Sequence, residues 1–203
     1  MKGFTLIELL AVIVIMGILM VVAIPAVSRT IENTRKDTYL NTAKQYISQV
    51  KTLWAADGLK CTNSNGSYTE TVYSADAGDA TYYIQIKGGE NFLLEEGGNS
   101  SWKAKAAGWI KVERSDKKNT YSIYLEDTKG HVIVRTAIDP ASNDPLFIYA
   151  PESQLSRSNN HTFGESGAPV VGSETYGDNG DDTANPTGAA PSAGPNVYIC
   201  EEA

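Results

Sequence analysis

Few side chains in this 203-residue sequence have the type and spacing needed to catalyse a reaction or hold a metal. His131 and His161 are the two histidines, no GxSxG motif occurs, and no pair of carboxylates has a spacing typical of catalysis. Asp178, Asp181 and Asp182 lie close together in YGDNGDDT, but they do not match the spacing of an EF-hand calcium loop. We therefore predict a protein that is not an enzyme, binds no cofactor, and carries these aspartates in a solvated loop, with calcium binding by this loop as the alternative.

One carboxylate has an unusual setting. Glu8 lies near the start of MKGFTLIELLAVIVIMGILMVV, and no further ionisable side chain follows it until after Val27. A charge at membrane depth costs roughly 2.5 to 3.5 kcal/mol on insertion scales. Glu8 therefore needs a partner, and no Lys or Arg inside the apolar run can supply one.

The segment that carries Glu8 is apolar over residues 4–27. As a helix it would be about 36 Å long, which is enough to cross the hydrocarbon core of a membrane. A secretory signal peptide has a shorter apolar stretch followed by a cleavage site with small residues. We predict a membrane-spanning helix half here.

The helical pattern continues over residues 28–58, where apolar residues recur at steps of three and four. These residues are Leu40, Ala43, Ile47, Val50 and Trp54. We predict one helix over residues 4–57, weakened at Gly17, kinked at Pro25, and stopped by Gly58 in the left-handed conformation. Its second half is amphipathic and should pack on a domain.

The sequence after Gly58 alternates in the manner of half-buried strands. The segments are 81–87, 109–114, 120–126 and 131–136. Short turn-rich connections predict an antiparallel meander for the last three. Val132 and Val134 should then face Ile123 and Leu125 in a core that the helix covers.

The last part of the chain changes in composition. Residues 156–195 are rich in Gly, Pro, Ser, Asn and Asp, which predicts a long surface loop before NVYIC forms an edge strand. We thus predict an α+β fold in which the second half of a long N-terminal helix packs on an antiparallel β-sheet, with the sheet domain at residues 59–203.

Cys61 and Cys200 are the two cysteines, and they are too far apart for a CxxC motif or a zinc pair. An even count in an extracellular domain favours a disulfide. The bridge would close a loop of roughly 140 residues, worth about 5 kcal/mol in the chain-entropy model. The alternative is two buried thiols in a cytosolic protein, which the membrane segment disfavours.

The charge pattern limits the partners. A net charge of −7 argues against a protein that mainly coats nucleic acid or anionic lipid, and leaves room for a local basic patch. Positive residues are concentrated around one predicted turn. We interpret them as a solvated face, and the alternative is a contact with DNA or an acidic neighbour. They are Lys103, Lys105, Lys111, Arg114, Lys117 and Lys118.

The residues from Gly3 to Glu8, GFTLIE, followed by an unbroken apolar run, closely resemble the class III signal of type IV pilins and the related pseudopilins. This resemblance implies a leader at residues 1–3, which a prepilin peptidase removes between Gly3 and Phe4, and methylation of the new amine of Phe4. It implies that Glu8 pairs with the N-terminal ammonium of a neighbouring subunit. Gly17 and Pro25 match positions where the family's helix loosens in the filament.

The resemblance implies a structural subunit of an extracellular type IV pilus, serving adhesion, motility or surface attachment. Its partners would be copies of itself or other pilins, the prepilin peptidase, the inner assembly machinery, and the membrane before assembly. The chain would be a single-pass membrane protein first and part of a surface filament afterwards. Two alternatives remain: a pseudopilin of a type II secretion or DNA-uptake machine, and a single-span membrane protein with a binding ectodomain.

Overall fold

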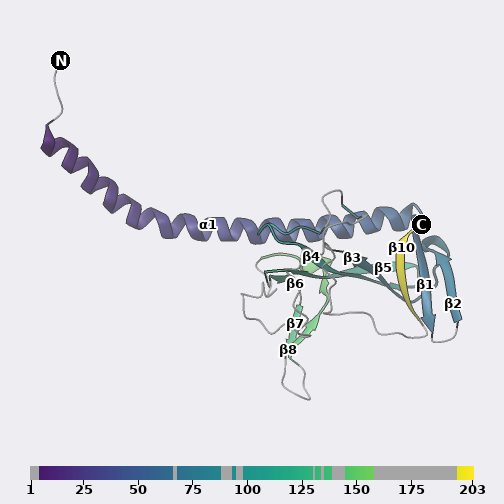
Figure 1. The fold of residues 1–203 in the computed structure, drawn as a ribbon. Coiled ribbons are helices and arrows are strands. Elements are labelled where there is room, and N and C mark those ends of the chain that lie inside the picture. Colours follow the sequence, from purple (N-terminus) through teal and green to yellow (C-terminus); the bar gives the residue numbers. More distant parts are fainter. Residues whose placement is uncertain are drawn as a thin grey trace.

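The computed structural model describes residues 5–65, 68–87, 93–94, 98–129, 131–133, 135–138, 145–157 and 196–203. A long helix, α1 (Leu6–Ala55), leads into a sheet domain that lies along its C-terminal half (Figure 1). The predicted α+β architecture is confirmed, because this one helix is followed by an eight-stranded, mostly antiparallel sheet. The core lies between them.

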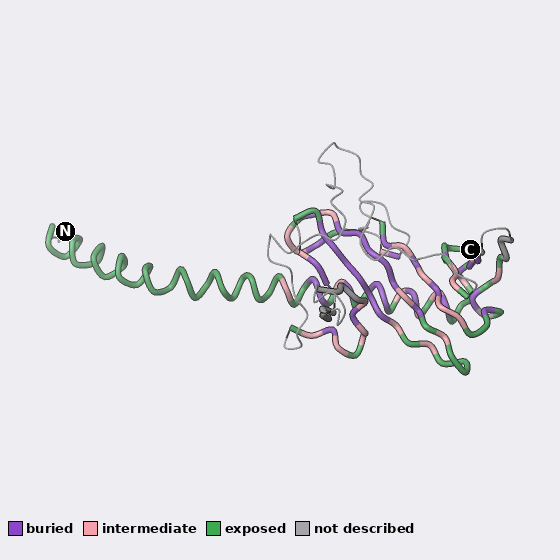
Figure 2. The backbone as a smooth tube through the Cα atoms, turned by 90° about the horizontal axis from the view of Figure 1, so that it is seen from below, coloured by how far each residue is buried: buried purple, intermediate pink, exposed green. Residues whose placement is uncertain are grey.

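Helix α1 has two halves with different surroundings. No residue of α1 before Tyr39 is buried, whereas the second half of the helix packs against the domain (Figure 2). All five residues of the predicted apolar stripe, from Leu40 to Trp54, are buried. Tyr39 and Tyr46 add a second buried row that the stripe did not include.

Helix α1 ends in a hydrogen-bonded cap. The N–H of Asp57 donates to the carbonyl of Trp54, and the N–H of Gly58 donates to that of Leu53, the pattern of a Schellman motif. Asp57 has the left-handed φ of 57°, so the prediction that Gly58 takes this conformation was wrong. Aspartate adopts this conformation more readily than most residues, and the Ser74 hydroxyl donates to its carboxylate at 3.0 Å, which ties the end of the helix to the domain.

The strands follow in chain order. The main sheet contains β1 (Leu59–Asn65), β2 (Tyr68–Tyr73), β3 (Thr81–Ile86), β4 (Ala106–Ser115), β5 (Lys118–Asp127), β6 (Val132–Ile133), β9 (Ala150–Pro151) and β10 (Val197–Glu202). A separate hairpin contains β7 (Arg135–Ile138) and β8 (Pro145–Ile148). Two short 3-10 turns, η1 (Ser74–Asp76) and η2 (Glu152–Gln154), complete the described elements.

The strand order differs from the prediction at the end of the chain. The order is β2-β1-β10-β3-β4-β5-β6, so β4, β5 and β6 form the predicted antiparallel meander. Strand β10 lies inside the sheet, antiparallel to β1 and parallel to β3, so its prediction as an edge strand was wrong. Strands β1 and β2 were not predicted, and they cover the side of β10 that would otherwise be an edge.

The register at β6 also differs from the prediction. Leu125 pairs with Ile133, and Ile133 is 1% exposed in the core under the helix. Val132 packs with Tyr124 in a separate cluster, because successive residues of a strand face opposite sides. The prediction that Val132 joins Ile123 and Leu125 was therefore wrong, and Val134 lies outside the described residues.

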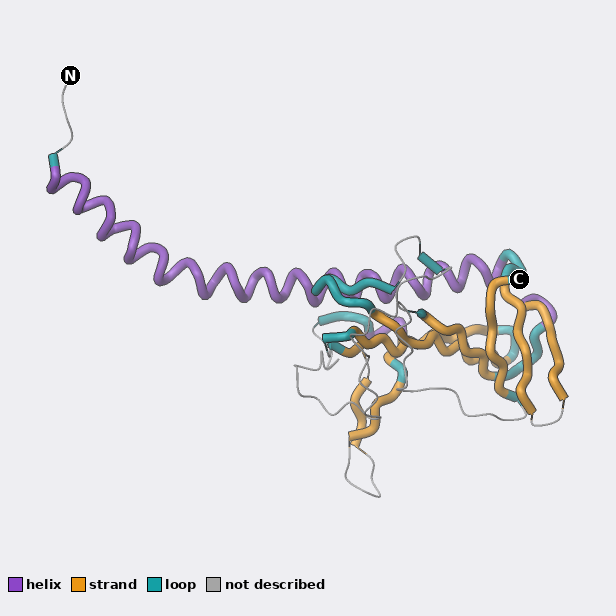
Figure 3. The backbone as a smooth tube through the Cα atoms, viewed as in Figure 1, coloured by secondary structure: helices purple, strands orange, loops and turns teal. Residues whose placement is uncertain are grey.

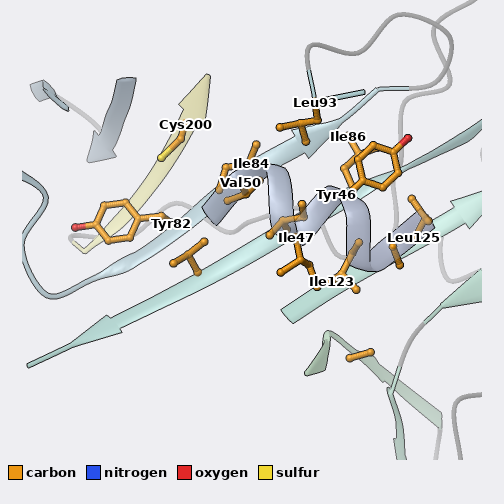
Figure 4. Packing of buried hydrophobic residues seen from close by; sticks show 14 of the residues in the cluster. Tyr46, Ile47, Val50, Tyr82, Ile84, Ile86, Leu93, Ile123, Leu125 and Cys200 are labelled. Carbon is orange, nitrogen blue, oxygen red and sulfur yellow. The ribbon is translucent and has the colours of Figure 1, made fainter. Parts of the chain in front are cut away.

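The core joins the helix to the centre of the sheet. Tyr46, Ile47 and Val50 of α1 pack over side chains of β3 and β5 (Figure 4). Each fully buried large apolar side chain contributes roughly 1.5 to 3 kcal/mol. The domain therefore holds α1 firmly from Tyr39 onward and leaves the preceding helix without intramolecular support.

Candidate assembly site on the N-terminal helix

The exposed half of α1 is apolar on every side. Leu6 is 82% exposed and Val21 is 74% exposed, and large apolar side chains between them are exposed in the same way. The helix is long and apolar enough to cross a membrane by length and composition. Such a surface is stable only in lipid or among other apolar helices.

Glu8 has hydrogen-bond donors within its own chain. The N–H and the hydroxyl of Thr5 donate to Glu8 Oε2 at 2.8 and 2.7 Å, while the N–H of Glu8 lies 3.4 Å from Thr5 Oγ1. This is a capping box, which satisfies N–H groups at the start of the helix. Both donors are neutral, so the carboxylate keeps its net charge.

Sequence reasoning missed this role of Thr5. The sequence signal was available, because Thr-x-x-Glu before an apolar run is the signature of a capping box. The helix start also favours a negative charge through the helix dipole. Glu8 is therefore held at a fixed place, at the start of α1, with a charge that a cation from outside the chain can meet.

Pro25 lies inside α1 without ending it. Figure 3 shows one continuous helix that curves over the half containing Pro25. Proline has no N–H to donate, which leaves the carbonyl four residues earlier without its usual partner. The Ser28 hydroxyl donates to the carbonyl of Ile24 at 3.0 Å, a contact that favours bending.

Gly17 is not required by packing within this chain, since a Cβ at this position would meet no atom within 4 Å. Its predicted role, loosening the helix in a filament, stays a prediction. The predicted cleavage and methylation residues, Gly3 and Phe4, lie outside the described residues, as do His161, the three aspartates of YGDNGDDT and most of the predicted loop at 156–195.

The structure joins Cys61 to Cys200 in a disulfide, which fits the pairing expected from the even cysteine count. The two residues lie directly opposite each other on β1 and β10, and both are buried. The bond ties the returning C-terminal strand to the strand that follows α1. The N–H of Ala203 then donates to the carbonyl of Gly58 at 3.0 Å, which brings the chain end to the end of the helix.

His131 belongs to a structural cluster at the end of the domain nearest the exposed half of α1. Asp127 is 2% exposed and accepts hydrogen bonds from the Ser100 hydroxyl at 2.7 Å and from the N–H groups of Lys129 and His131 at 2.9 Å. The His131 ring stacks on Trp102, with centroids 3.9 Å apart. Ser100 donates to the carboxylate, so this is not the serine–histidine contact that activates a nucleophile.

The described residues contain no group of three or more His, Cys, Asp or Glu side chains that could hold a metal ion. The cations that the sequence placed in one cluster are separated by the structure. Lys103 lies beside the Asp127 cluster, whereas Lys117 and Lys118 lie at the opposite end of the β4–β5 hairpin. Strand β4 has 10 residues, so these ends are about 30 Å apart.

Residues 1–24 match the family of the prokaryotic N-terminal methylation motif, which is the class III signal peptide of type IV pilins and pseudopilins. The match covers Glu8 and Gly17 and ends just before Pro25. No curated protein and no solved structure matches the chain.

Proposed function

We propose that this chain, which carries the N-terminal methylation motif of type IV pilins and pseudopilins, is a structural subunit of an extracellular type IV pilus. One observation carries the proposal: the described part of the matched segment, residues 5–24, lies in the half of α1 that is apolar on all sides and unsupported by the domain. A helix of this kind needs lipid before assembly and neighbouring helices afterwards. The domain would form the surface of the filament.

Processing prepares the contact between subunits. A prepilin peptidase would cut between Gly3 and Phe4 and methylate the amine of Phe4, which leaves the amine positively charged. Thr5 and Glu8 both remain in the mature chain, so the capping box survives the cut. The net charge of Glu8 would then meet the ammonium of Phe4 on a neighbouring copy.

The partner supplied by the neighbour explains why a glutamate is tolerated in the apolar run. Two opposite charges in a low-dielectric surrounding are tolerated when both are satisfied, whereas one left unpaired costs several kcal/mol. The motif and the apolar helix also fit anchoring in the membrane before assembly. The subunit would be held there until its helix moves from lipid into the filament core.

The same motif fits a pseudopilin of a secretion or DNA-uptake machine. The test is to shear filaments from intact cells that produce the chain and to detect it by immunogold labelling along their length. A matched strain without the prepilin peptidase provides the control. Labelled surface filaments that vanish in this control support the pilin, whereas a chain confined to the envelope whose deletion blocks secretion or DNA uptake supports the pseudopilin.

A further inference from the structure

Exposed cations gather at the end of the domain from which the exposed half of α1 emerges. We call Arg29, Arg35, Lys103 and Lys129 the basic collar, and all four are exposed. The Ser101 hydroxyl donates to the carbonyl of Arg35 at 2.7 Å, which holds the loop of Lys103 against the helix. Lys129 Nζ donates to the carbonyl of Trp102 at 2.6 Å, which joins the second loop to the first.

Nearby carboxylates already have partners of their own. Glu32 pairs with Lys36 at 2.7 Å, and Asp37 pairs with Arg157 at 3.4 Å. Asp127 is buried and faces His131. Among the described residues, no ion pair involves the basic collar. Its charge therefore remains to attract an anion from outside the chain.

The helical period places Arg29 on the face of α1 that packs against the domain further along the helix. Arg29, Lys36, Ala43 and Val50 recur at steps of seven, so they lie on one face of α1. Ala43 and Val50 are buried under the sheet domain, which lies along one side of the helix in Figure 1. Arg29 therefore lies on the same face of α1 as these buried residues, before the part of the helix that the domain covers.

The distances fit the surface of a bilayer. At 1.5 Å per residue, Arg29 lies about 3 Å beyond the end of the apolar run, and Arg35 lies about 12 Å beyond it. The headgroup layer extends roughly 5 to 7 Å outside the hydrocarbon core. Arg29 therefore lies within this layer, and Arg35 lies within one Debye length of it, about 8 Å at physiological salt.

We infer that the basic collar binds the phosphate headgroups of anionic phospholipids and holds the domain against the membrane before assembly. The inference rests on the membrane anchoring in the proposed function, but not on assembly into a filament. Lys and Arg next to a membrane span are usually enriched on its cytoplasmic side. Headgroup binding explains why this chain carries several of them next to its domain, while its net charge is −7.

The experiment uses the full chain in vesicles of phosphatidylcholine, alone or mixed with phosphatidylglycerol. Flotation first establishes that the chain is inserted, and hydrogen exchange then measures protection of residues 98–105. Protection should increase with phosphatidylglycerol and should be lost at about 1 M salt, where the Debye length falls to about 3 Å. A chain that does not float overturns the anchoring, and the inference with it.

The test variant is Arg35→Gln with Lys103→Gln, and the matched control is Lys117→Gln with Lys118→Gln. Each pair removes two positive charges, and Lys103 and Lys117 share a left-handed backbone, with φ of 56° and 61°. Each charge near an anionic surface is worth about fivefold, so the test variant should lose roughly 25-fold of the lipid-dependent protection. The control variant should keep most of the lipid-dependent protection, because its lysines lie at the far end of β4.

Three results would overturn the inference. The first is equal protection with and without phosphatidylglycerol. The second is an equal loss of lipid-dependent protection in the test variant and in the control variant. The third is protection that rises with the density of the chain in pure phosphatidylcholine, because the basic collar would then bind a second copy of the chain and not lipid.

Discussion

Glu8 can act in two ways, and substitutions separate them. It accepts hydrogen bonds from the N–H and the hydroxyl of Thr5, and it carries the charge that we propose meets a neighbour's ammonium. Glu8→Gln keeps a carbonyl oxygen for the capping contact but removes the charge. Thr5→Ala removes the hydroxyl but keeps the charge.

The two roles of Glu8 differ in how much free energy their loss should cost. Loss of a helix cap costs about 1 kcal/mol, or roughly fivefold in an equilibrium. An ammonium left unpaired in a low-dielectric filament core costs roughly 3 to 5 kcal/mol, which is more than 100-fold. Glu8→Gln and Glu8→Ala should therefore both be poorly incorporated into filaments, Glu8→Asp should do better, and Thr5→Ala should lose no more than about fivefold.

The assay is the ratio of sheared filament protein to the membrane pool for each variant, in cells that lack the original copy. The membrane pool is the internal control, because removing a charge makes the apolar run cheaper to insert. Near-normal incorporation of Glu8→Gln, together with a defect in Glu8→Ala, would show that Glu8 acts as a helix cap and not as an ion-pair partner.

Three further predictions concern the domain. Replacing Cys61 and Cys200 together by serine should lower the free energy of unfolding by about 5 kcal/mol in denaturant titrations, given the sequence separation of 139, and an unchanged midpoint would show that the bond does not stabilise the domain. Asp127→Asn loses charge-assisted hydrogen bonds worth roughly 1.5 to 3 kcal/mol, so the unfolding midpoint and the exchange protection of residues 98–105 should both fall, and unaltered protection would contradict the role of this cluster. Burial raises the pKa of Tyr82 from 10.0 to about 12, so the folded state keeps a proton that the unfolded state releases, and stability should fall as pH rises from about 10 to 12. Tyr82→Phe should make stability fall less steeply over this pH range. An unchanged slope would contradict the assignment of this pH dependence to Tyr82.

The amphipathic half of α1 could be predicted because its apolar residues repeat at the helical period and all face one sheet. Strands β1 and β2 could not, because LKCTNSN and YTETVY lack a clear apolar alternation and are held by pairing with β10. Missing them made β10 look like an edge strand. The end of α1 was misassigned for a related reason, since the contact between Asp57 and Ser74 forms only in the folded domain.

In the candidate site too, some features could be predicted from the sequence and others could not. The isolation of Glu8 in an apolar run is a property of the sequence, and its contact with Thr5 follows from local spacing. The basic collar could not be predicted, because Arg35, Lys103 and Lys129 are far apart in the chain and are brought together by Ser101 and Trp102. Counting neighbouring lysines instead grouped Lys103 with Lys117, which lies at the other end of a long hairpin.

The central claim, that this chain is processed and assembled as a pilin, is tested most directly at its N-terminus. Intact-mass and peptide mass spectrometry of protein sheared from the cell surface should find a chain that begins at a methylated Phe4. Surface protein that still begins at Met1, or that begins at Phe4 with an unmodified amine, would contradict the account.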